Sequence, residues 1–81
     1  MPRRYSVREV PLALERAGFQ FQRQQGSHMQ YRGVWRGRQR NVTLVAGQRQ
    51  IPPRTLDSIL DQAGLTVREL SLLIEGEDVA E

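Results

Sequence analysis

The sequence predicts an α+β fold, in which three antiparallel strands form one sheet and the helices pack on one of its faces. Two stretches, 7–17 and 52–63, carry apolar residues at helical spacing, and between them apolar and polar residues alternate as in strands. The connections between the alternating segments are short, which favours antiparallel hairpins. The predicted order is therefore α-β-β-β-α, with a short extra helix at the C-terminal end.

The first helix has a start signal and a stop signal. Ser6 is followed three residues later by Glu9, so the two can form a capping box in which each side chain bonds the other's backbone amide. Gly18 is a natural C-terminal stop. Pro11 removes an early helical hydrogen bond, so we expect the helix either to kink or to begin there.

Three strands are expected next, over 19–24, 28–35 and 40–45, separated by turns at 25–27 and 36–39. In the second strand, alternation places one set of side chains towards the core and the other set outwards. The inward set is Met29, Tyr31 and Trp35, and the outward set is His28, Gln30 and Arg32. Phe19 and Phe21 of the first strand are also expected in the core.

The second long helix begins at Pro52-Pro53, since proline is well accommodated in a first turn, and ends at Gly64. Its apolar stripe consists of Leu56, Ile59, Leu60 and Ala63. The short third helix starts with a second capping box, Thr66 to Glu69, and Gly76 stops it. It carries the apolar residues Val67, Leu70, Leu73 and Ile74.

Because each long helix has a single apolar stripe, the simplest arrangement packs both on one face of the sheet and leaves the other face to solvent. This is the layout of double-stranded-RNA-binding-like folds, which recognise the shape and the 2′-hydroxyls of RNA. With 81 residues the chain forms one domain, expected over 1–74, and its thin core favours an open face or groove over an enclosed pocket. Residues 75–81 are expected to be a frayed acidic tail.

The composition narrows the classes of function. Cysteine is absent, which excludes disulfides, thiolate metal sites and cysteine nucleophiles and fits a reducing cytoplasm. No segment has the roughly 18 apolar residues of a membrane span. Arg3 and Arg4 are not followed by an apolar run, so no secretory signal and no membrane partner are expected.

Positive charge is concentrated in the first part of the chain. All twelve basic residues are arginine, and residues 1–74 hold these twelve with five acids, a net charge of 12 − 5 = +7. The tail holds the other four acids. A basic body of this kind attracts phosphate. Ten of the arginines lie in residues 1–50, opposed only by Glu9 and Glu15. The codon usage of a GC-rich genome would explain arginine in place of lysine, but not this concentration of charge in one half.

Three ordered stretches resemble the HicA toxin family. They are Leu14-Glu15-Arg16-Ala17-Gly18-Phe19, then Arg23-Gln24-Gln25-Gly26-Ser27-His28-Met29-Gln30-Tyr31, then Thr55-Leu56-Asp57-Ser58-Ile59-Leu60-Asp61-Gln62-Ala63-Gly64-Leu65. With their spacing they span about residues 7–70. The resemblance implies a double-stranded-RNA-binding-type fold, the toxin role in a type II toxin–antitoxin system, mRNA cleavage without the ribosome, and a HicB-like antitoxin as partner.

The resemblance also implies site residues. The histidine of Gly-Ser-His is the family's catalytic residue, which is His28 here, with Gly26 and Ser27 as its setting. Many members carry a proline and a second histidine after the third strand. Here residues 45–49 read Val-Ala-Gly-Gln-Arg, and the chain contains no second histidine.

The residues themselves suit metal-independent cleavage of RNA, which needs no cofactor because the substrate carries its own nucleophile, the 2′-hydroxyl. His28 can take or give a proton near neutral pH. Arg23 and Arg32 can stabilise the phosphorane charge, Gly26 lets the backbone approach the phosphate, and Ser27 can donate a hydrogen bond to it. The other proton transfer would fall to water, Tyr31 or the substrate.

Other interpretations remain open on the residues alone. A lone histidine at the start of a strand is usually a surface hydrogen-bonder, and Arg23 and Arg32 would equally suit a solvated strand face. The chain would then be a non-catalytic RNA-binding module, favoured by the missing second histidine, or a domain whose basic face docks an acidic antitoxin. Asp57 and Asp61 are expected to be exposed helix carboxylates rather than metal ligands. The arginines expected to contribute only diffuse phosphate steering are Arg3, Arg4, Arg36, Arg38 and Arg40.

Overall fold

The computed structural model describes residues 5–47, 49–77 and 79, and it confirms the α+β architecture. The elements are α1 (Glu9–Arg16), β1 (Gln20–Gln25), β2 (His28–Trp35), β3 (Arg38–Val45), α2 (Pro53–Ala63) and α3 (Val67–Ile74). The three strands form one antiparallel sheet in the order β1-β2-β3. Arg3, Arg4, Asp78 and Glu81 lie outside the described residues, so the frayed tail stays a prediction.

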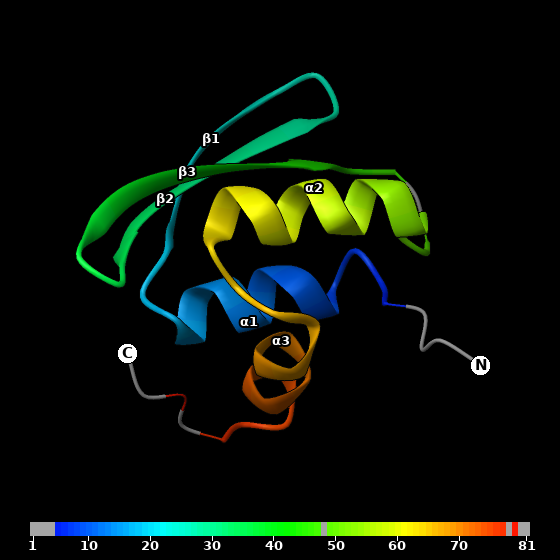
Figure 1. Cartoon of the computed structure of the whole chain (residues 1–81). Helices are drawn as coiled ribbons and strands as arrows, with labels where there is room; N and C mark the ends of the chain where they lie inside the picture. Colours follow the sequence, from blue (N-terminus) through cyan, green and yellow to red (C-terminus); the bar gives the residue numbers. More distant parts are fainter. Residues whose placement is uncertain (1–4, 48, 78, 80–81) are drawn as a thin grey trace.

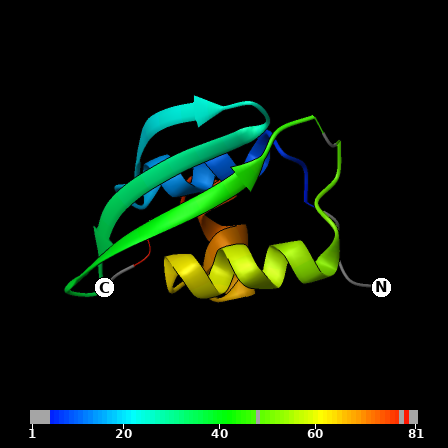
Figure 2. The same cartoon turned by 90° about the horizontal axis from the view of Figure 1, so that it is seen from above.

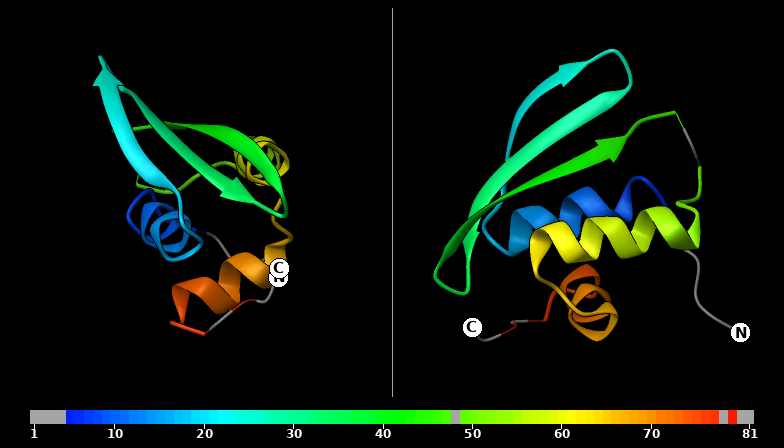
Figure 3. Two further views of the ribbon diagram at one scale, coloured as in Figure 1. Left: turned by 90° about the vertical axis from the view of Figure 1, so that its left-hand side faces the viewer. Right: turned by 45° about the horizontal axis from the view of Figure 1, so that its top comes forward.

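Both long helices cover the same face of the sheet, as predicted (Figure 1). Seen from above, α1 lies beneath β1 and β2 while α2 runs beside β3 (Figure 2). The short helix α3 packs under α1, on the side away from the sheet (Figure 3). The other face of the sheet has no helix over it.

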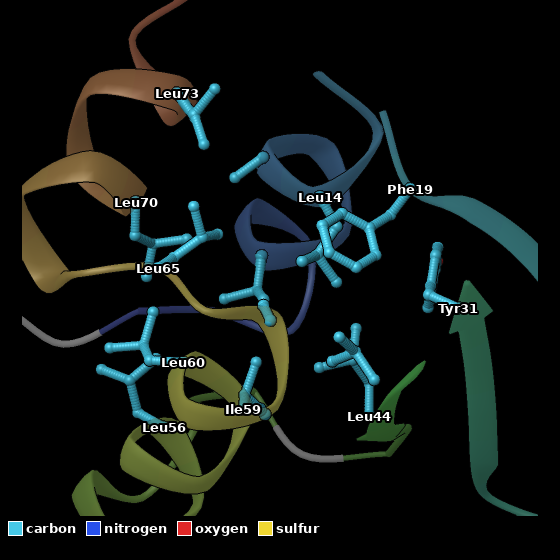
Figure 4. Packing of buried hydrophobic residues seen from close by; sticks show 14 of the residues in the cluster. Leu14, Phe19, Tyr31, Leu44, Leu56, Ile59, Leu60, Leu65, Leu70 and Leu73 are labelled. Atoms are coloured by element: carbon cyan, nitrogen blue, oxygen red, sulfur yellow. The ribbon is translucent and has the colours of Figure 1, made fainter. Parts of the chain in front are cut away.

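The core lies between the sheet and the helices, and apolar side chains from the strands and from α1, α2 and α3 meet in it (Figure 4). Leu14 of α1, Leu44 of β3 and Ile59 of α2 are at most 2% exposed. Tyr31 and Trp35 of β2 are also buried, as is Phe19, which confirms the predicted inward face. All four apolar residues of the α2 stripe are buried.

Hydrogen bonds at the helix starts agree with the sequence signals. Ser6 and Glu9 exchange backbone and side-chain bonds of 3.0 and 3.1 Å, and Thr66 and Glu69 form the second capping box. Helix α1 begins at Glu9, so Pro11 lies in its first turn, where the missing N–H would have had no helical partner. No interruption of α1 by Pro11 results.

Two expectations about the sheet were wrong. β3 begins at Arg38 rather than residue 40, because Arg36 and Gly37 form a two-residue turn with φ angles of 53° and 75°, as tight hairpins require. Phe21 is 48% exposed rather than buried. It faces the helix side, but β1 rises away from the helices, and the Phe21 and Tyr31 rings meet edge to face with their centroids 5.6 Å apart.

The two edges of the sheet differ in how closely the helices cover them. At the β3 edge, the backbone N–H of Thr43 donates to the side-chain oxygen of Gln62 on α2 at 2.9 Å. At the other edge, all six residues of β1 are exposed. The helix layer therefore covers β3 more closely than β1.

Where β1 begins, the chain passes directly over the middle of β2. A Cβ added at Gly33 would lie 2.8 Å from the Cα of Phe19 and 3.0 Å from the carbonyl oxygen of Gly18. Because these are backbone atoms, the clash can be relieved only by moving the strand. We predict that Gly33→Ala lowers the free energy of unfolding by about 1–3 kcal/mol.

Thermal unfolding followed by circular dichroism checks this prediction, with an expected fall in Tm of roughly 4–8 °C for each kcal/mol. The neighbouring Val34→Ala is the control, because Val34 is 61% exposed and its truncation should cost less than about 1 kcal/mol. Equal melting temperatures for Gly33→Ala and the unmodified protein would contradict the packing described here.

Candidate functional site

The open face of the sheet is organised by the strand register into rows of three side chains. Residues paired across an antiparallel sheet lie on the same face, and the residues between the buried positions of β2 point away from the helices. Each row holds one residue of β1, one of β2 and one of β3, in that order. The rows are Gln25-His28-Val45, Arg23-Gln30-Thr43 and Gln20-Arg32-Asn41.

His28 is the first residue of β2 and is exposed. It follows directly on the Gly26-Ser27 turn, whose tight reversal depends on a φ of 57° at Gly26. Within the described part of the chain its ring has no hydrogen-bond or ionic partner. The imidazole is therefore accessible to a ligand from the open face.

Arg23 reaches this face because of a β-bulge. Phe21 pairs with Tyr31, but the next pair is Arg23 with Gln30, so Gln22 is an extra residue in β1. In a regular strand Phe21 and Arg23 would share a face. The bulge reverses the alternation, so that Phe21 faces the helices and Arg23 lies in the row between His28 and Arg32.

The rows next to His28 are polar and hydrogen-bonded. Arg32 donates from Nε to the Asn41 side-chain oxygen at 3.2 Å, and the Thr43 hydroxyl donates to the Gln30 side chain at 3.0 Å. A depression lies over these rows, lined by Gln22, Arg23, Gln30, Tyr31, Arg32 and Asn41. The sequence reasoning did not identify Gln30, Asn41 and Thr43 as site residues, although the alternation in 40–45 contained the signal for Asn41 and Thr43.

The Gly26-Ser27 turn is anchored to the end of β3. The carbonyl oxygen of Ser27 accepts a hydrogen bond from the N–H of Ala46 at 2.6 Å. Ser27 is itself exposed and immediately precedes His28. The turn thus holds the two residues beside each other at one end of the open face.

Tyr31 also lines the depression over the polar rows, but its position in β2 directs its side chain to the other side of the sheet. Its side chain belongs to the core and is 5% exposed. Burial and, to a smaller extent, the negative charge of Glu15 raise the pKa of the Tyr31 phenol above its ordinary value. This burial confirms the expected core position of Tyr31 and argues against Tyr31 as the second proton-transfer group at the open face.

Several arginines away from the open face hold the fold together. Arg36 forms an ion pair with Glu69 and lies 5.4 Å from the Trp35 ring centre, and the Nε of Arg40 donates to the carbonyl oxygen of Trp35 at 3.1 Å. Arg16 donates to the carbonyl oxygens of Leu73 and Ile74 at the end of α3. Arg36 and Arg40 thus have structural contacts, while Arg36 and Arg38 are both exposed, and their diffuse steering of phosphate stays a prediction.

Asp57 and Asp61 are exposed on α2, as predicted. Among the described residues, no three histidine or carboxylate side chains come together in a way that could hold a metal ion. The helices of the described part are all too short or too polar to cross a membrane.

A search of curated proteins gives no significant match. The model of a protein family described as the HicA toxin of bacterial toxin–antitoxin systems matches residues 7–65, which include α1, the whole sheet and α2. The match covers most of the 81 residues. The chain therefore belongs to the HicA toxin family, and its role is that of the toxin in a toxin–antitoxin pair.

Proposed function

We propose that this toxin is a metal-independent endoribonuclease that cleaves mRNA, with His28 as general acid or base. The observation that carries the proposal is that an exposed imidazole, with no side-chain partner among the described residues, shares the open face with Arg23 and Arg32. An acid–base group beside two guanidinium groups matches what phosphoryl transfer from RNA requires.

In the proposed reaction the 2′-oxygen of a ribose attacks the adjacent phosphorus. The 2′-hydroxyl loses its proton, the bond from phosphorus to the 5′-oxygen breaks, and that oxygen takes up a proton. The products are a 2′,3′-cyclic phosphate and a free 5′-hydroxyl. His28 performs one proton transfer, and water or the substrate performs the other, since Tyr31 is buried on the far side of the sheet.

The guanidinium groups of Arg23 and Arg32 would stabilise the negative charge that develops on the phosphorane. Arg32 is oriented by its bond to Asn41, and Arg23 lies one row nearer to His28. Gly26 and Ser27 would let backbone and hydroxyl donors approach the same phosphate. The physiological partner would be a HicB-like antitoxin that covers this basic face, in the cytoplasm where the mRNA is found.

One observation favours a second function. The chain contains a single histidine, so one of the two proton transfers has no dedicated side chain. A non-catalytic RNA-binding module would have the same open face and would bind RNA without cutting it. The two functions differ in whether cyclic-phosphate ends appear.

We predict that His28→Ala reduces the rate of RNA cleavage by about 10²–10⁴-fold, because one positioned proton-transfer group contributes about that much. The measurement is the appearance of 2′,3′-cyclic-phosphate ends on single-stranded mRNA. Gln25→Ala, in the same row, is the matched control and should leave the rate nearly unchanged. Equal cleavage by His28→Ala would overturn the assignment of His28, and RNA binding without cleavage by the unmodified protein would support the second function.

Tyr31→Phe should leave the cleavage rate within about twofold of the unmodified protein, since its hydroxyl lies away from the open face. Single-turnover cleavage assays with purified protein measure this. A loss of a hundredfold or more with the fold intact would show that the phenol takes part in the reaction.

Replacing both Arg23 and Arg32 with glutamine should weaken RNA binding and its dependence on salt. Each lost phosphate contact lowers the slope of log affinity against log salt concentration by about 0.7 for a single strand, so about 1.4 for both. Fluorescence anisotropy with labelled RNA at several salt concentrations gives the slope. Arg68→Gln, an exposed arginine on α3, is the control, and an equal effect from it would indicate nonspecific attraction only.

A further inference from the structure

A hollow of about 560 Å³ lies at the end of the molecule where β3 finishes, lined by Ser6, Val7, Arg8, Gly47, Arg49 and Gln50. Its lining residues belong to the segment before α1 and the loop after β3, and Figure 1 shows these two segments near each other. Two backbone hydrogen bonds join these segments, from Ile51 to Tyr5 at 2.8 Å and from Val7 to Arg49 at 3.3 Å. Its size lies within the range of sites that bind small molecules, so it can receive a nucleotide.

The arginines of the hollow carry positive charges that are not engaged in contacts within the described part of the fold. Arg8 and Arg49 are exposed, and within the described part of the chain neither guanidinium has a hydrogen-bond or ionic partner. The carboxylate nearest in sequence, Glu9, accepts a bond from the Ser6 N–H, and none of the described residues that line the hollow is acidic. This separates Arg8 and Arg49 from Arg16, Arg36 and Arg40, which have structural contacts.

The position of the hollow relative to His28 indicates a function for the hollow. Val45 pairs with His28, and Arg49 follows only four residues later, at most about 15 Å along the chain. Arg23 and Arg32 lie in the opposite direction, in the rows further along β2. The loop that carries Arg49 therefore leaves the sheet at the His28 row, on the side away from the rows of Arg23 and Arg32.

We propose that the hollow is a second phosphate subsite, in which Arg8 and Arg49 bind a phosphodiester of the RNA strand that runs past His28. The inference rests on the proposed function and extends it, because the RNA is then held on both sides of the phosphate that is cleaved. Two guanidinium groups with neighbouring hydroxyl and amide groups suit a phosphate and its ribose. RNA too short to span from the open face to the hollow gains nothing from this subsite.

The test is RNA binding by the full chain in a His28→Ala background, in which cleavage is slowed enough for binding to be measured. Two labelled single-stranded RNAs are compared, one of about four and one of about twelve nucleotides. Replacing Arg8 and Arg49 together with glutamine should weaken binding of the longer RNA roughly tenfold and lower its salt slope by about 1.4, with little effect on the shorter RNA. The double lysine variant keeps both charges and should retain the slope. The matched control is the double glutamine variant of Arg38 and Arg68, which removes the same charge elsewhere.

The outcomes are distinct. If the Arg8/Arg49 glutamine variant binds the longer RNA with unchanged affinity and unchanged salt slope, the subsite is overturned and the proposed function is not affected. An equal loss of affinity in the Arg38/Arg68 control variant leads to the same conclusion. If the His28→Ala protein binds neither RNA, the proposed function and the subsite fail together. Circular dichroism confirms the fold of each variant; a variant that did not fold would contradict the assignment of Arg8 and Arg49 as free of structural contacts.

Discussion

Burial of one face of β2 against the helices is the constraint on which the rest of the structure depends. Tyr31 and Trp35 enter the core, together with Val42 and Leu44 of the neighbouring strand. A strand that buries alternate residues must expose the residues between them, so His28, Gln30 and Arg32 are placed on the open face by the same packing that stabilises the domain. A shift of the register by one residue would exchange the two faces, and the site would be lost with the core.

The arginines divide by what they contact. Some connect elements of the fold: Arg16 binds the end of α3, and Arg36 connects the β2–β3 turn to the start of that helix. Others, such as Arg8, Arg23 and Arg49, have no partner among the described residues and lie around the end of the sheet where His28 is found. Net charge alone therefore overstates the positive surface available to RNA, because part of it is used to hold α3 against the rest of the domain.

The sequence predicted the elements that strong local signals define. The capping boxes at Ser6 and Thr66 gave two helix starts, and glycine gave the helix stops. The bounds of β2 were predicted without error, since its alternation continues without interruption between two glycine-containing turns. These features depend on neighbours in the chain, which is why they could be predicted from it.

Features that depend on contacts between distant segments could not be predicted in this way. The bulge at Gln22 leaves no clear mark in the alternating stretch, yet it decides the face on which Arg23 lies. The exposure of Phe21 follows from the rise of β1 away from the helices, and the hollow between Arg8 and Arg49 exists only because the loop after β3 pairs with the segment before α1. The location of His28 was predictable, whereas the surroundings of its ring depended on the pairing of three strands.

The most direct test of the central claim is to map where RNA contacts the protein in solution. An NMR titration of the isotope-labelled chain with 2′-O-methyl RNA, which lacks the nucleophile and stays intact, would report shifts residue by residue. The largest changes are expected at the His28 ring and at Arg23 and Arg32, with none on α3. Changes confined to the helices, with the His28 signals unaffected, would contradict it.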